Sequence, residues 1–275
     1  MPVVLAAFLQ SLIVASCVML LVWFVQVATS NRLMRVMGRR PAWFFCAPGI
    51  ICHELSHALM CFVFFHRITS MSLVTYDPQS ATLGYVHHIY RTSSFYQRLG
   101  LLYIGLAPFL LGPLVILLGA QLLLPEPDKI FSLIRIAGDS IELAPTFTTM
   151  FSESITLYLS LWDAVLELAK DSLVLTTVWL AVSGSIAIHC APSPADLRSA
   201  ATGLAYNSVL VIVCGSIAVA AGWEWPEAAH WLGFAASLYL LVIALCLVWW
   251  LVLMGISIVI SAIKRTTSAG TNAAL

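Results

Sequence analysis

Six long apolar runs dominate the chain. They cover residues 3–29, 42–65, 99–124, 172–195, 204–222 and about 230–262. A helix needs about 20 residues to cross the hydrocarbon core of a bilayer, and each run reaches or approaches that length. The pattern therefore predicts an all-α polytopic membrane protein with about six transmembrane helices. Because we find no internal repeat, we expect one membrane-embedded domain over residues 1–275, in three parts: 1–41, 42–200 and 201–275.

Two polar segments separate these runs. Residues 66–98 place β-branched and aromatic residues on both sides of the turn signal Asp77-Pro78 and of Gly84, which predicts a small β-hairpin. Residues 125–171 carry three basic and eight acidic side chains, a net charge of −5. Residues 141–170 of this acidic loop have helical periodicity, so we expect one or two amphipathic helices on the membrane surface there.

Composition agrees with the membrane assignment and excludes other classes. The chain is 61% hydrophobic and 9% charged, and its mean hydropathy is +0.96. Its formal net charge is zero and no basic run is interleaved with aromatic residues, so nucleic acid is not an expected partner. The expected partners are the lipid bilayer and other membrane segments. All seven cysteines lie in or beside apolar segments without a CxxC pair, which is typical of reduced, buried thiols.

One apolar run contains a polar motif, His53-Glu54-Leu55-Ser56-His57, whose insertion into a membrane is unfavourable. An ionised carboxylate at the middle of a membrane helix costs about 2–4 kcal/mol, so a partner must offset it. On a helix, His53 and His57 lie on one face, about 6 Å apart at Cβ, a spacing that suits one tetrahedral zinc ion. Glu54 projects about 100° away from His53, beside the metal, where a general base would stand.

A catalytic zinc normally has three protein ligands, so the chain must supply one more. The candidates near membrane depth are His66, His189 and Asp196. His66 is nine residues from His57 and faces roughly the opposite side of a straight helix. Asp196 is preferred over His189, because a carboxylate at the edge of an apolar run needs a cation. Pro192 and Pro194 predict an extended stretch just before it.

These motifs resemble those of the site-2 protease family of intramembrane zinc metalloproteases. That family pairs a membrane-embedded HExxH with a later Asn-x-x-Pro-x-Pro-x-Leu-Asp-Gly. HELSH at 53–57 matches the first motif. The segment 189–196, HCAPSPAD, keeps the Pro-x-Pro and the Asp, but it has His189 for Asn, is one residue shorter and is followed by Leu197. LGYV at 83–86 and LGPLV at 111–115 are similar to two further family elements.

The resemblance covers about residues 42–200 and implies a function. It implies hydrolysis of peptide bonds in single-spanning membrane-protein substrates, in or near the bilayer, by a multi-pass protein of a bacterial cytoplasmic membrane. By analogy, His53, His57 and Asp196 would bind zinc and Glu54 would be the catalytic base. The substrate contacts would include His189, Gly84 and Tyr85. The inserted domain that many relatives carry is replaced here by the acidic loop 125–171.

Two other functions are compatible with the sequence. The altered second motif is compatible with a non-proteolytic, zinc-binding membrane assembly subunit. Alternatively, the chain is a membrane zincin of the prenyl-protease type, which takes a Glu as its third ligand. Glu153 and Glu167 are the candidates, although both lie in the polar loop.

Loop charges predict the orientation in the membrane only in part. The positive-inside rule places residues 66–98, with a net charge of +2, and the pair Lys264-Arg265 on the cytoplasmic side. The basic link 31–40, with four arginines and no acid, then falls outside, against the same rule.

Overall fold

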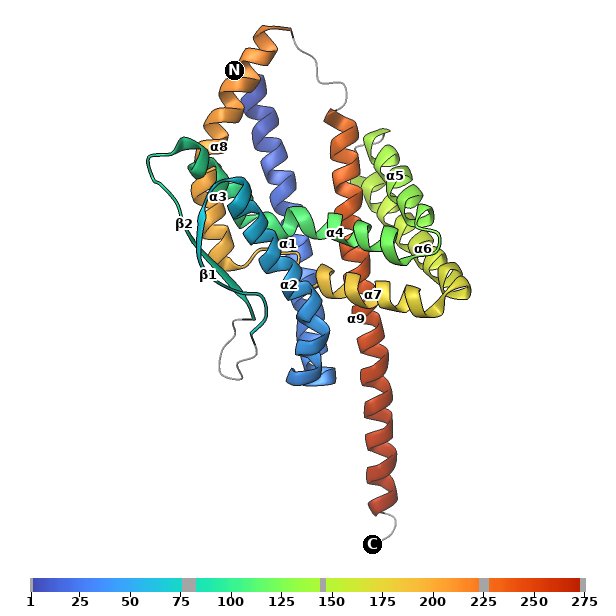
Figure 1. Ribbon diagram of the computed structural model, residues 1–275. Coiled ribbons are helices and arrows are strands. Elements are labelled where there is room, and N and C mark those ends of the chain that lie inside the picture. The colour runs from blue at the N-terminus through green and yellow to red at the C-terminus, as the bar shows by residue number, and fades with distance from the viewer. Residues whose placement is uncertain (1, 76–82, 144–146, 223–227, 273–275) are drawn as a thin grey trace.

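The fold consists of a helical bundle with one small β-hairpin against its side (Figure 1). The computed structural model describes residues 2–75, 83–143, 147–222 and 228–272. Within these ranges the elements are α1 (Pro2–Met37), α2 (Arg39–Val63), β1 (Arg67–Ser72), β2 (Tyr85–Ile89), α3 (Phe95–Gly105), α4 (Ala107–Leu123), α5 (Asp128–Leu143), α6 (Phe147–Asp171), α7 (Leu173–Ala187), α8 (Pro194–Ala220) and α9 (Ala228–Asn272).

Four helices are long and apolar enough to cross a membrane. The candidate spans are Ser16–Met37, Arg39–Val63, Pro194–Ala220 and Phe234–Ile260. Helices α3 and α4 pass the same test together as one span bent by 58°, which raises the number to five. Helix α7 is apolar but has only 15 residues. The expected all-α membrane fold is therefore confirmed in outline, and the described helices supply four or five spans by this test.

Two helix boundaries differ from the expected pattern. The basic link 31–40 is not a loop, because α1 continues to Met37 and only Gly38, with a φ of 78°, separates it from α2. The fifth apolar run starts earlier than expected, because Pro194 opens α8. Proline is well suited to the first turn of a helix, where the missing N–H would have no partner. Asp196 consequently lies in the first turn of a spanning helix.

The acidic segment 125–171 is a pair of packed helices and not a loop. Helices α5 and α6 lie beside α9 in Figure 1, and their apolar faces enter the main hydrophobic core. The residues they bury there are Ile130, Ile134, Leu161, Val165 and Leu168. Their charged faces remain outside, where Lys129 forms ion pairs with Glu126, Glu167 and Asp171. The amphipathic helix expected in residues 141–170 is present as α6, but its apolar face packs in the core of the protein and not on the membrane surface as expected. Helix α5 was not predicted.

The predicted hairpin is present and packs against α2. Strands β1 and β2 pair antiparallel, with Arg67 opposite Ile89 and Ser72 opposite Tyr85. A bulge between Ile68 and Ser70 shifts the register. The expected turn at Asp77-Pro78 lies outside the described residues.

The charged segments are distributed differently from the expected topology. Figure 1 shows the connection between α1 and α2 at the same end of the molecule as the C-terminal end of α9. The end of α2 that leads into the hairpin lies toward the opposite end. The basic link 31–40 and the basic pair after residue 263 thus share one end, and the base of the hairpin does not lie with them.

Helices α3 and α8 pack closely because glycines line their contact. A Cβ on Gly203 would collide with the backbone nitrogen of Leu102, and one on Gly105 would lie 2.8 Å from the nitrogen of Ala200. The amide of Asn207 also donates to the carbonyl of Leu99 at 3.0 Å. This contact sets the position of the first turn of α8 and therefore of Asp196.

A Gly203→Ala substitution is expected to separate α3 from α8 and to destabilise the fold. Overpacking of this kind costs about 1–3 kcal/mol, because backbone cannot move aside as a flexible side chain can. The measurement is the thermal unfolding temperature of the detergent-solubilised protein.

Gly255 provides a matched control, because an added Cβ on this α9 residue would meet nothing within 4 Å. Gly255→Ala should leave the unfolding temperature unchanged or raise it, since alanine favours a helix by about 1 kcal/mol over glycine. Equal unfolding temperatures of Gly203→Ala and Gly255→Ala would contradict the close α3–α8 contact.

Candidate metal centre

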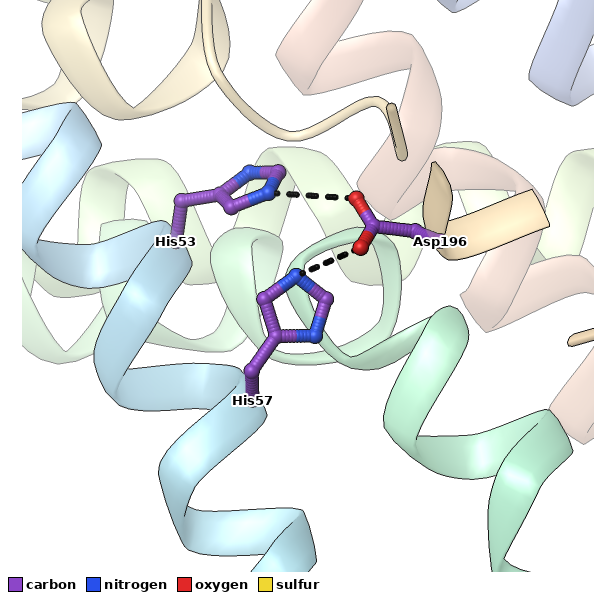
Figure 2. A group of neighbouring side chains, drawn as sticks. All are labelled: His53, His57 and Asp196. Atoms are coloured by element: carbon purple, nitrogen blue, oxygen red, sulfur yellow. Dashed lines mark ion pairs between the residues drawn. The ribbon is translucent and has the colours of Figure 1, made fainter. Parts of the chain in front are cut away.

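Three side chains from two distant helices converge on one point (Figure 2). Helix α2 contributes His53 and His57, which lie one helical turn apart on the same face. Helix α8 contributes Asp196, whose two carboxylate oxygens face the two rings. The Nε2 atom of His53 lies 3.5 Å from Oδ2, and the Nε2 atom of His57 lies 3.3 Å from Oδ1. All three ligand atoms lie within 4.8 Å of one another, so the group can hold a metal ion.

The hydrogen bonds of the two rings fix which nitrogen faces the centre. Nδ1 of His53 donates to the carbonyl of His189 at 2.8 Å, and Nδ1 of His57 donates to the carbonyl of Ile104 at 2.7 Å. A carbonyl oxygen only accepts, so Nδ1 carries the proton in each neutral ring. The Nε2 atoms then present lone pairs toward Asp196. Metal-binding histidines typically donate their other ring N–H to a carbonyl or carboxylate in this way.

A divalent cation fits the set of groups that face the centre. Two ring lone pairs and two carboxylate oxygens are all acceptors, and they have no proton to share when both rings are neutral. The Nε2 atom of His57 is buried, and in the neutral ring it makes no hydrogen bond with Oδ1 of Asp196 3.3 Å away, because both atoms are acceptors. A buried polar atom without a partner is costly, and a bound cation would remove that cost.

Asp196 is held in place by the start of its own helix. The Ser193 hydroxyl accepts from the backbone N–H of Asp196 at 3.3 Å, and the Ser193 backbone N–H donates to Oδ2 of Asp196 at 2.7 Å. This reciprocal pair is a capping box. Ser193 is extended, with a ψ of 165°, but Pro194 and Ala195 already belong to α8, so the extended backbone ends before the first turn of the helix and not directly at Asp196 as expected.

Gln26 on α1 contacts the connection that leads to Asp196, and sequence reasoning missed it. Its side-chain oxygen accepts from the backbone N–H of Ala191 at 2.8 Å. Within a membrane an extended backbone is tolerated only where protein groups satisfy it. The available signal was a glutamine near the end of the long apolar run 3–29, which contains one other, Gln10.

Glu54 and Gly84 meet beside the three ligands. Glu54 is only 7% exposed. A Cβ added to Gly84 would lie 2.7 Å from Cγ of Glu54 and 3.0 Å from its Oε1. The absence of a side chain at residue 84 therefore allows the hairpin to approach the carboxylate. Glu54 is placed as the sequence predicted, beside the metal group and not within it.

A cavity of about 730 Å³ joins these groups. Its lining includes the three metal-binding candidates, Glu54 and every residue from Leu83 to His88. His189 and Tyr85, the other expected substrate contacts, also line it. Nδ1 of His189 donates to the carbonyl of Ser185 at 2.9 Å, which leaves its Nε2 atom as an acceptor.

His66 does not join the metal group, as the helical angle predicted, but it has a partner that the sequence did not indicate. Its Nε2 donates to the carbonyl of Gln97 at 2.8 Å, and its Nδ1 lies 3.0 Å from Nδ1 of His88. Burial, followed by the neighbouring histidines, lowers the pKa of His88 to about 4, so this pair is neutral near pH 7. His88 is half-buried and lines the cavity.

No family model, curated protein or solved structure matches the chain. Function must therefore be argued from the site itself. Of the alternative third ligands, Glu167 forms an ion pair with Lys129 at 3.4 Å on the charged face of α6. The side chain of Glu153 lies outside the described residues.

Proposed function

We propose that this protein is an intramembrane zinc metallopeptidase that hydrolyses membrane-spanning substrates. The observation that carries the proposal is the convergence of two imidazole nitrogens and one carboxylate from two distant helices, with all three ligand atoms within 4.8 Å of one another. Two histidines and one carboxylate are a ligand set of catalytic zinc, and such sites leave a fourth position open. The motif resemblance points to the same chemistry.

Each residue has a separate role in the proposed reaction. His53, His57 and Asp196 would hold zinc, which when bound supplies a Lewis acid and lowers the pKa of water toward neutrality. Glu54 accepts a proton from the attacking water and later returns it to the leaving amine. The protein carbonyls of His189 and Ile104 orient the two imidazoles.

Strand β2 is the proposed docking site for the substrate backbone. Among the described residues the sheet has two strands, so one edge of β2 is not paired by them, and residues 83–88 line the cavity. An unwound substrate segment could pair with this edge, and main-chain pairing of this kind gives affinity with little dependence on sequence. Tyr85 and His189 are the side chains proposed to contact the segment.

The remaining finer assignments belong to the same proposal. We propose six crossings, in which the bent pair α3–α4 counts as one and the short α7 as another. The partners are then a single-spanning membrane protein and the lipid bilayer, in a bacterial cytoplasmic membrane.

Metal removal tests the proposed function directly. Purified protein is expected to contain about one zinc per chain and to cleave a reconstituted single-spanning test substrate whose helix contains glycine and proline. Chelation should abolish cleavage, and added Zn²⁺ should restore it. Zinc binding without cleavage of any substrate in a panel would favour the non-proteolytic assembly subunit. Absence of zinc would overturn the metal assignment itself.

A further inference from the structure

A second cavity lies at the base of the hairpin. It has a volume of about 530 Å³, and its lining consists of Phe65, Arg67, Ile89, Tyr90, Arg91 and Gln97. No residue of this lining belongs to the lining of the metal cavity, which reaches along the hairpin only to His88. The second cavity is therefore not part of the candidate metal centre.

Two arginines face this second cavity together. Arg67 lies in β1 opposite Ile89, Arg91 lies two residues beyond the end of β2, and both line the same cavity. Two long side chains that line one cavity can reach around one ligand. Within the described part of the chain, neither guanidinium forms an ion pair with a carboxylate. Two adjacent positive charges without a counter-charge favour an anion.

Gln97 lines the cavity and forms hydrogen bonds with the backbone on both sides of it. Its amide nitrogen donates to the carbonyl of Phe65 at 2.8 Å, and its amide oxygen accepts from the backbone N–H of Arg91 at 2.6 Å. Phe65 has a φ of 56°, a conformation that a bulky residue rarely adopts. The chain on both sides of the cavity is therefore fixed to α3, which holds the two arginines near one another.

The position of the cavity indicates where the anion comes from. The candidate span of α2 ends at Val63, and the bent span begins at Phe95, so the cavity lies at the level where two membrane spans end. Exposed aromatic side chains surround this level, at Phe62 (76%), Phe65 (72%) and Phe95 (52%). Aromatic residues concentrate at membrane–water interfaces, which is also the depth of lipid phosphates.

We propose that Arg67 and Arg91 bind the phosphate of an anionic membrane lipid, with its acyl chains against the exposed aromatic residues. Arginine is suited to this because its planar guanidinium forms paired hydrogen bonds with phosphate oxygens. Basic side chains near a bilayer surface also attract anionic lipids. The proposal concerns a site separate from the metal group, and it holds whether or not the protein is a peptidase.

Lipid retention by the full-length protein tests this site. Protein in mixed micelles with phosphatidylglycerol is analysed by native mass spectrometry, with phosphatidylcholine and inorganic phosphate as separate arms. We expect preferential retention of phosphatidylglycerol, and about a fivefold loss of its affinity in Arg67→Gln or Arg91→Gln and about thirtyfold in the double variant. Arg67→Lys with Arg91→Lys keeps both charges and should keep most of the affinity, which separates lost charge from misfolding.

Arg40→Gln is the matched control, because Arg40 is also an exposed arginine but lies at the other end of α2. It should retain phosphatidylglycerol as the wild type does. Equal retention by the wild type and the double glutamine variant would overturn the proposal. Equal binding of inorganic phosphate alone would overturn the assignment to a lipid, because the site would then fill from solution. Failure of the peptidase proposal would change none of these results.

Discussion

A Glu54→Gln variant is expected to keep its zinc and to lose about 10²–10⁴-fold in the rate of peptide hydrolysis. Glutamine has nearly the size of glutamate, so it should fill the same space against Gly84, where Glu54 is 7% exposed. Its amide cannot accept the proton that a carboxylate accepts from water. Zinc should remain because the three ligand atoms belong to other residues. The measurements are the cleavage rate of a reconstituted substrate and the metal content.

Glu126→Gln is the matched control for this substitution. Glu126 is an exposed carboxylate just before α5 and forms an ion pair with Lys129 at 3.4 Å. Exposed ion pairs contribute about 0–1 kcal/mol, so this variant should retain both cleavage and zinc. Wild-type cleavage by Glu54→Gln would show that another group serves as the base. Loss of zinc by Glu54→Gln would instead show that Glu54 takes part in binding the metal.

The sequence predicted the α2 part of the site well, because helical spacing alone determines it. Residues four apart share a face of any helix, and a carboxylate next to the first histidine must project beside them. Asp196 was also predicted, but from the cost of a charge near the membrane and from a motif resemblance. Its contact with α2 depends on the packing of α3 against α8 at Gly105 and Gly203, which is a property of the fold and not of local sequence.

Other features could not be predicted because they depend on distant contacts. The pairing of His66 with His88 depends on how the hairpin folds back beside the end of α2 and on the register between β1 and β2, which a bulge shifts. Amphipathic helices in residues 141–170 were expected on the membrane surface, since a charged face with an apolar face suits an interface as well as a core. Only the position of α9 shows that the apolar face is buried in the protein.

Asp196 combines two physical roles, which explains how a flexible acidic side chain is placed accurately. One oxygen, Oδ2, accepts from the backbone N–H of Ser193 and also faces His53, whereas Oδ1 faces His57. A carboxylate in the first turn of α8 also interacts favourably with the positive end of the helix dipole. The capping box therefore sets the orientation of the ligand before any metal binds.

These two roles can be separated by substitution. Asp196→Asn keeps an oxygen for the Ser193 N–H but removes the negative charge, so the fold should persist while zinc affinity falls. Outer-shell partners of zinc contribute about 10–100-fold in affinity, and loss of a charged ligand should exceed that range. The measurement is a zinc titration against a competing chelator, together with the unfolding temperature of the apo protein.

Ser193→Ala should give the opposite result, because it removes the hydroxyl cap and leaves the carboxylate and the backbone N–H of residue 193 in place. Loss of such a cap costs about 1 kcal/mol of stability, so the apo protein should unfold at a lower temperature with zinc still bound tightly when supplied. If Asp196→Asn bound zinc as tightly as the wild type, Asp196 would be only a capping residue. The third ligand would then have to come from another cavity side chain, and His189, whose Nε2 is an acceptor and which lines the same cavity, would be the next candidate.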